Sequence, residues 1–121
     1  MHNYLLSYTT IFPKKEDDIV IISMQKINAQ NVNLINAWKV ELECVLSWNA
    51  RRFILDMSRI SNPTLHLIQV LTTLCAIAKG VGKILILCNV PSDERCFYRV
   101  VEKYAPYHLA TNIEEAKNME V

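Results

Sequence analysis

The pattern of apolar and polar positions divides the chain into alternating strands and helices. Residues 52–57 and 83–88 are short, largely apolar runs, as expected of strands that are covered on both faces of a parallel sheet. Between them, apolar residues recur at helical spacing, namely Leu67, Ile68, Leu71, Leu74, Cys75 and Ala78. This order predicts a strand–helix–strand unit whose two strands are parallel.

Local signals predict the ends of this helix. Asn62 is a suitable N-cap, and Pro63 fits the first helical position, where a missing backbone N–H costs nothing. Gly80 predicts a left-handed stop at the other end. We expect His66, Gln69, Val70, Thr73 and Ile77 to lie on the outer face of the helix, away from the buried stripe.

The first part of the chain predicts a hairpin and a helix. Residues 5–12 and 19–24 are rich in β-branched and aromatic residues, and the polar residues 13–18 between them are typical of a turn. Residues 30–33 open a helix that ends at 49–51. Its predicted buried side is Leu34, Ile35, Trp38, Leu42, Val45 and Leu46.

The last part predicts two helices around a short strand. Ser92 or Asp93 caps a third helix, whose apolar face is Phe97, Val100, Val101 and Tyr104. A strand at 107–110 follows, and Thr111 with Glu114 forms a capping box that opens a final helix to about Met119. The whole chain, 1–121, therefore predicts one α/β domain: a mixed sheet of four to five strands, an N-terminal hairpin followed by βαβ units, and about four helices, largely on one side.

Composition narrows the function classes. The net charge is +1, which gives no electrostatic argument for nucleic acid or for an acidic membrane surface. No apolar run reaches the roughly 18 residues that cross a membrane, and no signal peptide opens the chain, so we expect a cytoplasmic protein without membrane insertion. Cys44, Cys75 and Cys88 lie in apolar runs, which favours buried free thiols over metal or redox chemistry.

Cofactor chemistry has no support in the sequence. The only glycines are Gly80 and Gly82, which belong to one turn, so a glycine-rich phosphate loop is missing and no cofactor is expected. No nucleophile, base and orienting acid stand out either, so we expect a protein that is not an enzyme.

Several segments resemble the STAS family, the domain shared by anti-sigma-factor antagonists and sulfate transporters. Residues 55–58, Leu-Asp-Met-Ser, resemble the family's Leu-Asp-Leu-Ser strand, and residues 27–31 resemble its Leu-Asp-x-x-Asn segment, with Asn28 in place of aspartate. The Lys-Gly-Val-Gly turn at 79–82 and the Thr-x-x-Glu-Glu-Ala segment at 111–116 fit as well. The resemblance covers the chain from about Tyr8 to its end.

The resemblance implies a regulator that binds a protein partner, an anti-sigma factor of the serine-kinase type. The family carries Asp-Ser-Ser-Gly at the start of the second helix, and phosphorylation of the second serine ends binding. Residues 64–67 here read Thr-Leu-His-Leu, which puts His66 at the switch position. The family's contact region corresponds to Thr64, His66, Gln69, Val70 and Thr73, with Asn28, Ser58 and Ser61 as secondary candidates.

Other interpretations of these residues and of the whole chain stay open. His66 also fits an ordinary exposed histidine, and Ser61 and Thr64 fit local capping. Asp56, at the carboxyl end of a predicted strand, fits a structural hydrogen bond better than a ligand site. The chain could instead be the STAS subunit of a lipid-transport ATPase, or it could bind a small apolar ligand. A homodimer is a further option.

Overall fold

The computed structural model describes residues 8–103 and 107–121. A five-stranded sheet has the order β1-β2-β4-β6-β7, and a two-stranded sheet pairs β3 with β5. The strands are β1 (Ile11–Glu16), β2 (Ile19–Met24), β3 (Ile27–Asn28), β4 (Arg52–Asp56), β5 (Ile60–Ser61), β6 (Ile84–Cys88) and β7 (His108–Leu109). The helices are α1 (Val32–Val45), α2 (Leu65–Gly80), α3 (Arg95–Glu102) and α4 (Ile113–Asn118). The predicted mixed α/β fold is confirmed.

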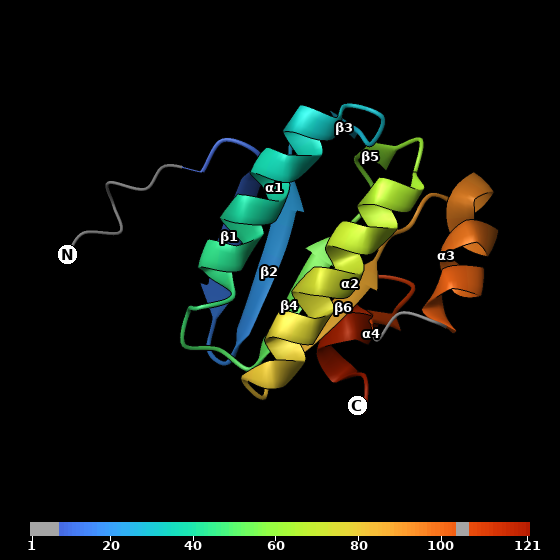
Figure 1. The fold of residues 1–121 in the computed structure, drawn as a ribbon. Helices are drawn as coiled ribbons and strands as arrows, with labels where there is room; N and C mark the ends of the chain where they lie inside the picture. The colour runs from blue at the N-terminus through green and yellow to red at the C-terminus, as the bar shows by residue number, and fades with distance from the viewer. Residues whose placement is uncertain (1–7, 104–106) are drawn as a thin grey trace.

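The strand pairing follows the predicted topology. β1 and β2 form an antiparallel hairpin, whereas β2–β4, β4–β6 and β6–β7 are parallel pairs. The unit β4–α2–β6 is therefore the parallel βαβ unit that the apolar runs predict. The small β3–β5 pair lies beyond the main sheet, next to the starts of α1 and α2 (Figure 1).

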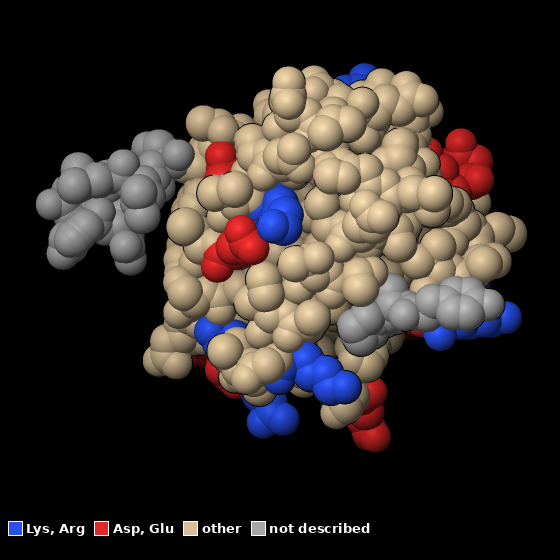
Figure 2. All heavy atoms as spheres, viewed as in Figure 1, with Lys and Arg blue, Asp and Glu red and all other residues tan. Residues whose placement is uncertain are grey.

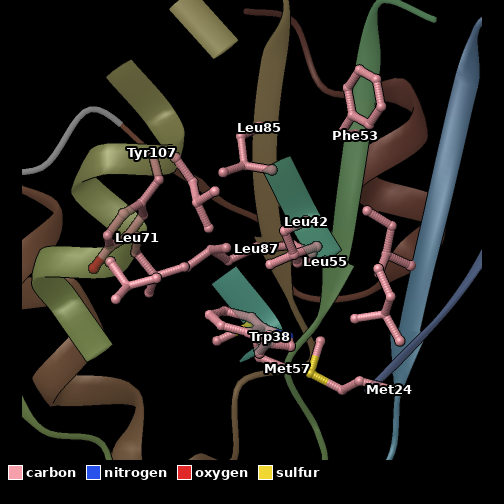
Figure 3. Close-up of a cluster of buried hydrophobic side chains, with 14 of the residues drawn as sticks. Met24, Trp38, Leu42, Phe53, Leu55, Met57, Leu71, Leu85, Leu87 and Tyr107 are labelled. Carbon is pink, nitrogen blue, oxygen red and sulfur yellow. The ribbon is translucent and has the colours of Figure 1, made fainter. Parts of the chain in front are cut away.

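The two faces of the sheet bury different sets of side chains. Phe53 and Leu55 of β4 belong to the large core that α1 and α2 cover, together with Trp38 and Leu71 (Figure 3). Ile54, on the opposite face, packs in a smaller cluster with residues of α4. Because successive strand residues point to opposite faces, the apolar run of β4 serves both layers. The sheet thus forms a rigid support for α1 and α2.

The N-terminal hairpin differs from its prediction in where the strands turn. β1 runs from Ile11 to Glu16, so Pro13, Lys14 and Lys15 lie in a strand, and the turn is at Asp17, which has a positive φ of 55°. β1 is an edge strand, where proline and lysine are tolerated because one side of the strand forms no ladder hydrogen bonds. The predicted start of this strand, residues 5–7, lies outside the described residues.

The ends of α2 also differ from the prediction. Thr64 is the N-cap: its side chain accepts a hydrogen bond from the Leu67 backbone N–H at 3.1 Å. Asn62 instead turns the chain after β5, with a positive φ of 53°, which asparagine tolerates better than most residues. At the other end, Gly80 is still helical, and the left-handed residue is Gly82, with φ 75°.

Two expected burial patterns are wrong. Cys44 is exposed, on the solvent side of α1, because the buried stripe of that helix passes through Leu42 and Val45 instead. In α3, Phe97 and Val101 are half-buried against the core as predicted, but the fully buried residue is Tyr98, and Val100 is 58 % exposed. Val100 lies two residues from Tyr98, about half a turn of the helix, and therefore faces away from the core. Tyr104, predicted for the same face, lies outside the described residues.

The ends of α1, α3 and α4 differ less from the prediction than those of α2. α1 has its N-cap at Asn31, as the predicted opening at 30–33 indicates, but the helix ends at Val45, before the predicted end at 49–51. α3 receives no side-chain cap hydrogen bond from Ser92 or Asp93. α4 is capped by Asn112, one residue after the predicted Thr111, and the Thr111 N–H donates to the Glu115 carboxylate instead.

Candidate functional site

The start of α2 lies beside the start of α1, at the same end of the sheet (Figure 1). The two helices are joined there by a hydrogen bond of 2.9 Å between His66 Nε2 and Asn36 Oδ1. An amide oxygen only accepts hydrogen bonds, so this pair requires the imidazole proton on Nε2. His66 is half-buried in this arrangement. The residue at the predicted switch position thus connects two helices and faces solvent in part.

Thr64 has a structural role at the same place. Its hydroxyl oxygen accepts the Leu67 N–H, one of the N–H groups at the start of α2 that have no partner within the helix. This is the capping function that the sequence left as an alternative reading.

The outer face of α2 is exposed along the helix, as predicted. Leu65 is 76 % exposed, and Gln69, Thr73, Ala76 and Ile77 are also exposed. Val70 is the exception: it is only 4 % exposed and belongs to the core, so its predicted place on the outer face is wrong. α2 packs beside α1 as well as on the sheet, and this second contact buries a wider stripe than packing on the sheet alone would.

The face formed by α1 and α2 has few charges. α2 carries one charged side chain, Lys79 in its last turn. In α1, Lys39 and Glu43 form an ion pair of 3.5 Å across one helical turn and so compensate each other. Figure 2 shows this side of the molecule as broad and largely uncharged, with one adjacent pair of opposite charges over α1. We call this surface the α1–α2 face, defined by Val32, Asn36, Val40, Leu65, His66, Gln69, Thr73 and Ile77.

The secondary candidates lie next to this face, in and around the β3–β5 pair. Asn28 and Ser61 are register partners, and the Asn28 side chain accepts the Gln30 N–H at 3.0 Å. Ser58 donates its N–H to the Asp56 carboxylate at 3.0 Å, so Asp56 has a structural hydrogen bond, in line with the structural reading of its role. Ser58 and Ser61 line an open cleft of about 460 Å³, which Asn28 does not reach.

The cleft carries charges of both signs. The positive charges in its wall are Lys26 and Arg59. The negative charges are Asp93 and Glu94, which lie in the turn before α3. Glu94 accepts the Asn62 N–H through Oε2 at 3.3 Å, while its Oε1 is buried and has no hydrogen-bond partner among the described residues. Glu94 thereby connects α3 to the loop that precedes α2.

Sequence reasoning missed Asn36, Leu65 and Glu94. Asn36 lies outside the predicted buried side of its helix, and only the packing of α1 on α2 shows that it meets His66. Leu65 gave a signal of its own, since it is a leucine directly beside the predicted apolar stripe and outside it. Glu94 has no signal in the sequence, because its contact with Asn62 joins residues 32 positions apart.

The described residues give no support to a metal site, a reactive thiol or a membrane-spanning helix. Within 8–103 and 107–121, no group of three or more His, Cys, Asp and Glu side chains is placed to hold a metal ion. Burial raises the pKa of the Cys75 thiol to about 12, which leaves it protonated at neutral pH and disfavours reactive-thiol chemistry. No helix in the described part of the chain is long and apolar enough to cross a membrane.

Comparison with known proteins supports the fold through structure alone. No protein-family model matches the sequence, and no curated protein matches it. A variant of RsbS from Moorella thermoacetica matches with a TM-score of 0.67 and 14% identity, over 90% of this chain and 96% of that one. The anti-sigma factor antagonist SpoIIAA in its unphosphorylated form matches with a TM-score of 0.60 and 14% identity, over 89% and 94% of the two chains. The chain has the STAS fold.

A third similar structure extends this set. An anti-sigma factor antagonist from Mycobacterium paratuberculosis matches with a TM-score of 0.60 and 12% identity, over 90% of this chain and 91% of that one. In each of these three comparisons, the match therefore covers nearly the whole of both chains. Identities this low establish a common architecture and leave the roles of individual side chains to physical argument.

Proposed function

We propose that this protein is a non-enzymatic regulator that binds an anti-sigma factor of the serine-kinase type through the start of α2 and the α1–α2 face. The similar structures include anti-sigma factor antagonists, and this chain spans their fold almost completely. We therefore expect the partner of this chain to be of the same class, an anti-sigma factor.

The exposed, charge-poor α1–α2 face is the observation that carries the proposal. The centre of a protein interface is depleted in charged residues, and the side chain of Leu65 stands 76 % exposed at the end of α2 where the family's switch lies. Beneath this face, Trp38 and Leu71 are fully buried, so the surface is held rigid. A rigid surface loses little conformational entropy on binding, which favours affinity.

The proposal includes a binding surface without the usual phosphoswitch. One similar structure is the phosphorylated form of the Bacillus protein SpoIIAA, so the fold accommodates a phosphate in that protein. Here the matched position is His66, which has no hydroxyl for a serine kinase to modify. Thr64 uses its hydroxyl as the cap of α2. The protein would therefore bind its partner whether or not the kinase is active.

The apolar-ligand alternative gains no support from the cleft beside α2. Four charged side chains line it, Lys26, Arg59, Asp93 and Glu94. Sites for apolar molecules are lined mainly by hydrophobic and aromatic side chains. No observation favours the transport-ATPase alternative over the anti-sigma factor.

The experiment is a titration of purified anti-sigma factors from the same organism with the wild-type protein and with His66→Asp. The substitution places a negative charge on the α1–α2 face. An unpaired charge in a desolvated contact costs several kcal/mol, so we expect affinity to fall on the order of a hundredfold. His108→Asp is the matched control, because His108 is exposed on β7 at the far edge of the sheet.

Circular dichroism checks that both variants fold. A folded His66→Asp protein with wild-type affinity would refute the proposed surface, and absence of binding to every anti-sigma factor would refute the partner class. A second assay incubates the complex with ATP and follows phosphate by mass spectrometry. We expect no phosphate at residues 61–66, and stoichiometric phosphate on Thr64 would show that the switch has moved and is not lost.

A further inference from the structure

A small cavity lies between α3 and the segment that joins β7 to α4. Its volume is about 70 Å³. Arg95 and Arg99 of α3 line it, together with Thr111 and Glu115. Val90, Tyr98, Leu109 and Ala110 complete the wall. None of these residues has a part in the proposed partner surface.

Arg95 and Arg99 occupy one side of α3. They are four residues apart, so their side chains are neighbours on the helix surface. Within residues 8–103 and 107–121, neither forms an ion pair. Like charges at this spacing destabilise an isolated helix, by roughly 0.2–0.5 kcal/mol. An anion shared between the two guanidinium groups would remove this repulsion and would accept several of their N–H donors.

The remaining polar groups of the cavity are compatible with an anion. The Glu115 carboxylate, the one acidic group in the wall, is already held by the Thr111 backbone N–H at 2.7 Å. Two arginines and one glutamate leave the wall with a formal charge of +1. The Tyr98 hydroxyl is buried without a hydrogen-bond partner among the described residues. The wall thus offers more donors than its own acceptors use.

The position in the sheet is also one where ligands bind. Val90 follows β6, and Ala110 and Thr111 follow β7, and these two strands are parallel neighbours. The cavity therefore lies outside the carboxyl ends of adjacent parallel strands, the region where open α/β sheets bind their ligands.

We propose that this cavity is a binding site for a small free tetrahedral oxyanion, with inorganic phosphate as its ligand. Arg95 and Arg99 supply paired N–H donors that match the oxygens of such an ion. Pockets for drug-sized ligands span ~300–1,000 Å³. A volume of about 70 Å³ is far below that range and suits a single small ion. Occupancy would connect α3 to the start of α4 and stiffen that edge of the sheet.

The test measures phosphate binding by isothermal titration and by thermal unfolding, with the ionic strength held constant by chloride. The variants are Arg95→Gln, Arg99→Gln and the double variant; both side chains are exposed, so the fold should persist. Arg51→Gln is the matched control, since Arg51 is an exposed arginine outside the cavity. We expect saturable 1:1 binding in wild type and control, and a rise in the unfolding midpoint with phosphate in both.

Each single variant should bind phosphate at least about tenfold more weakly, as loss of one charge-assisted contact implies. The double variant should show no saturable binding and no phosphate-dependent midpoint shift. Sulfate should compete with phosphate in the wild-type protein. Absence of saturable binding in the wild type, or equal binding in the double variant, would overturn the proposal. These outcomes concern α3 alone, so they are independent of partner binding at the α1–α2 face.

Discussion

α2 connects β4 to β6 and α3 connects β6 to β7, yet the two helices are held to the main sheet in different ways. α2 buries seven residues, and its outer side is almost free of charge. α3 buries one residue, Tyr98, and exposes Arg95 and Arg99. The buried contacts of α2 are enough to hold the helix in place. Its outer face is therefore available for binding a partner. A helix with one buried anchor depends on polar contacts, and its charges point to an ionic ligand.

The comparison predicts that truncation in the buried stripe of α2 has the largest effect on stability. Leu71 is fully buried in the main core. Leu71→Ala should lower the free energy of unfolding by about 2–5 kcal/mol, through lost burial and the cavity left behind. Chemical denaturation measures the change, with Gln69→Ala on the exposed side as control and an expected change within about 0.5 kcal/mol. Similar losses in the two variants would mean that α2 packs through another face.

Val70 sharpens the same comparison, because its position contradicts the sequence pattern. It is 4 % exposed, so Val70→Ala should lower the free energy of unfolding by roughly 1–3 kcal/mol, clearly more than Gln69→Ala. Denaturant titration of Val70→Ala and Gln69→Ala measures the two free energies of unfolding. An equal, small effect in both would place Val70 on the outer face, as the periodicity alone predicts.

α1 is a mixed case, since a polar contact adds to its packing. Glu41 accepts hydrogen bonds from the backbone and side chains of Thr9 and Thr10, at 2.7–3.0 Å. Partial desolvation raises the pKa of this carboxyl, but the hydrogen bonds outweigh it, and the net pKa is lowered. Glu41→Gln should therefore destabilise the protein at neutral pH, by about 1–2 kcal/mol.

The pH dependence gives the sign of this contribution. A carboxyl whose pKa is lower in the folded state stabilises the fold above its unfolded pKa and loses that effect as the pH falls through the folded pKa. The stability difference between wild type and Glu41→Gln should thus shrink as the pH is lowered below the ordinary glutamate range. A difference that stays constant on acidification would show that the Glu41 charge contributes nothing.

Tyr98→Phe should have the smallest effect. Burial raises the pKa of the Tyr98 phenol, with Glu94 and Tyr107 adding to the shift, and its hydroxyl has no hydrogen-bond partner in the described part of the chain. Removing an unsatisfied hydroxyl leaves the packing of the ring intact, so stability should stay equal or rise by up to about 1 kcal/mol. Thermal unfolding without phosphate measures it. A loss above about 1 kcal/mol would show that the hydroxyl is hydrogen-bonded.

The main elements could be predicted because their signals are local. The runs that became β4 and β6 and the periodicity of α2 each lie within one segment, and they are confirmed. Val70, Cys44 and Tyr98 could not be placed in this way, since their burial depends on which neighbour each helix meets. Capping by Thr64 was only an alternative in the sequence, because Asn62 and Pro63 are both good helix-start signals, and the β3–β5 pairing that overrides them joins distant residues.

The candidate site shows the same division. The exposure of Gln69 and Thr73 follows from helical spacing and is confirmed. The bond between His66 and Asn36 and the cleft that Ser58 and Ser61 share with Glu94 depend on tertiary contacts between segments about 30 residues apart. Sequence could therefore indicate which residues face outward, but it could not show which of them meet.

The most direct test of the partner surface is to map it residue by residue. Amide chemical shifts of the isotope-labelled protein, recorded with and without the unlabelled anti-sigma factor, report each backbone position. We expect the largest changes at Asn36, Leu65, His66, Gln69 and Thr73, with β1 and α3 unaffected. Changes that gather on α3 or on the β1 edge, while the α1–α2 face stays unperturbed, would contradict the account.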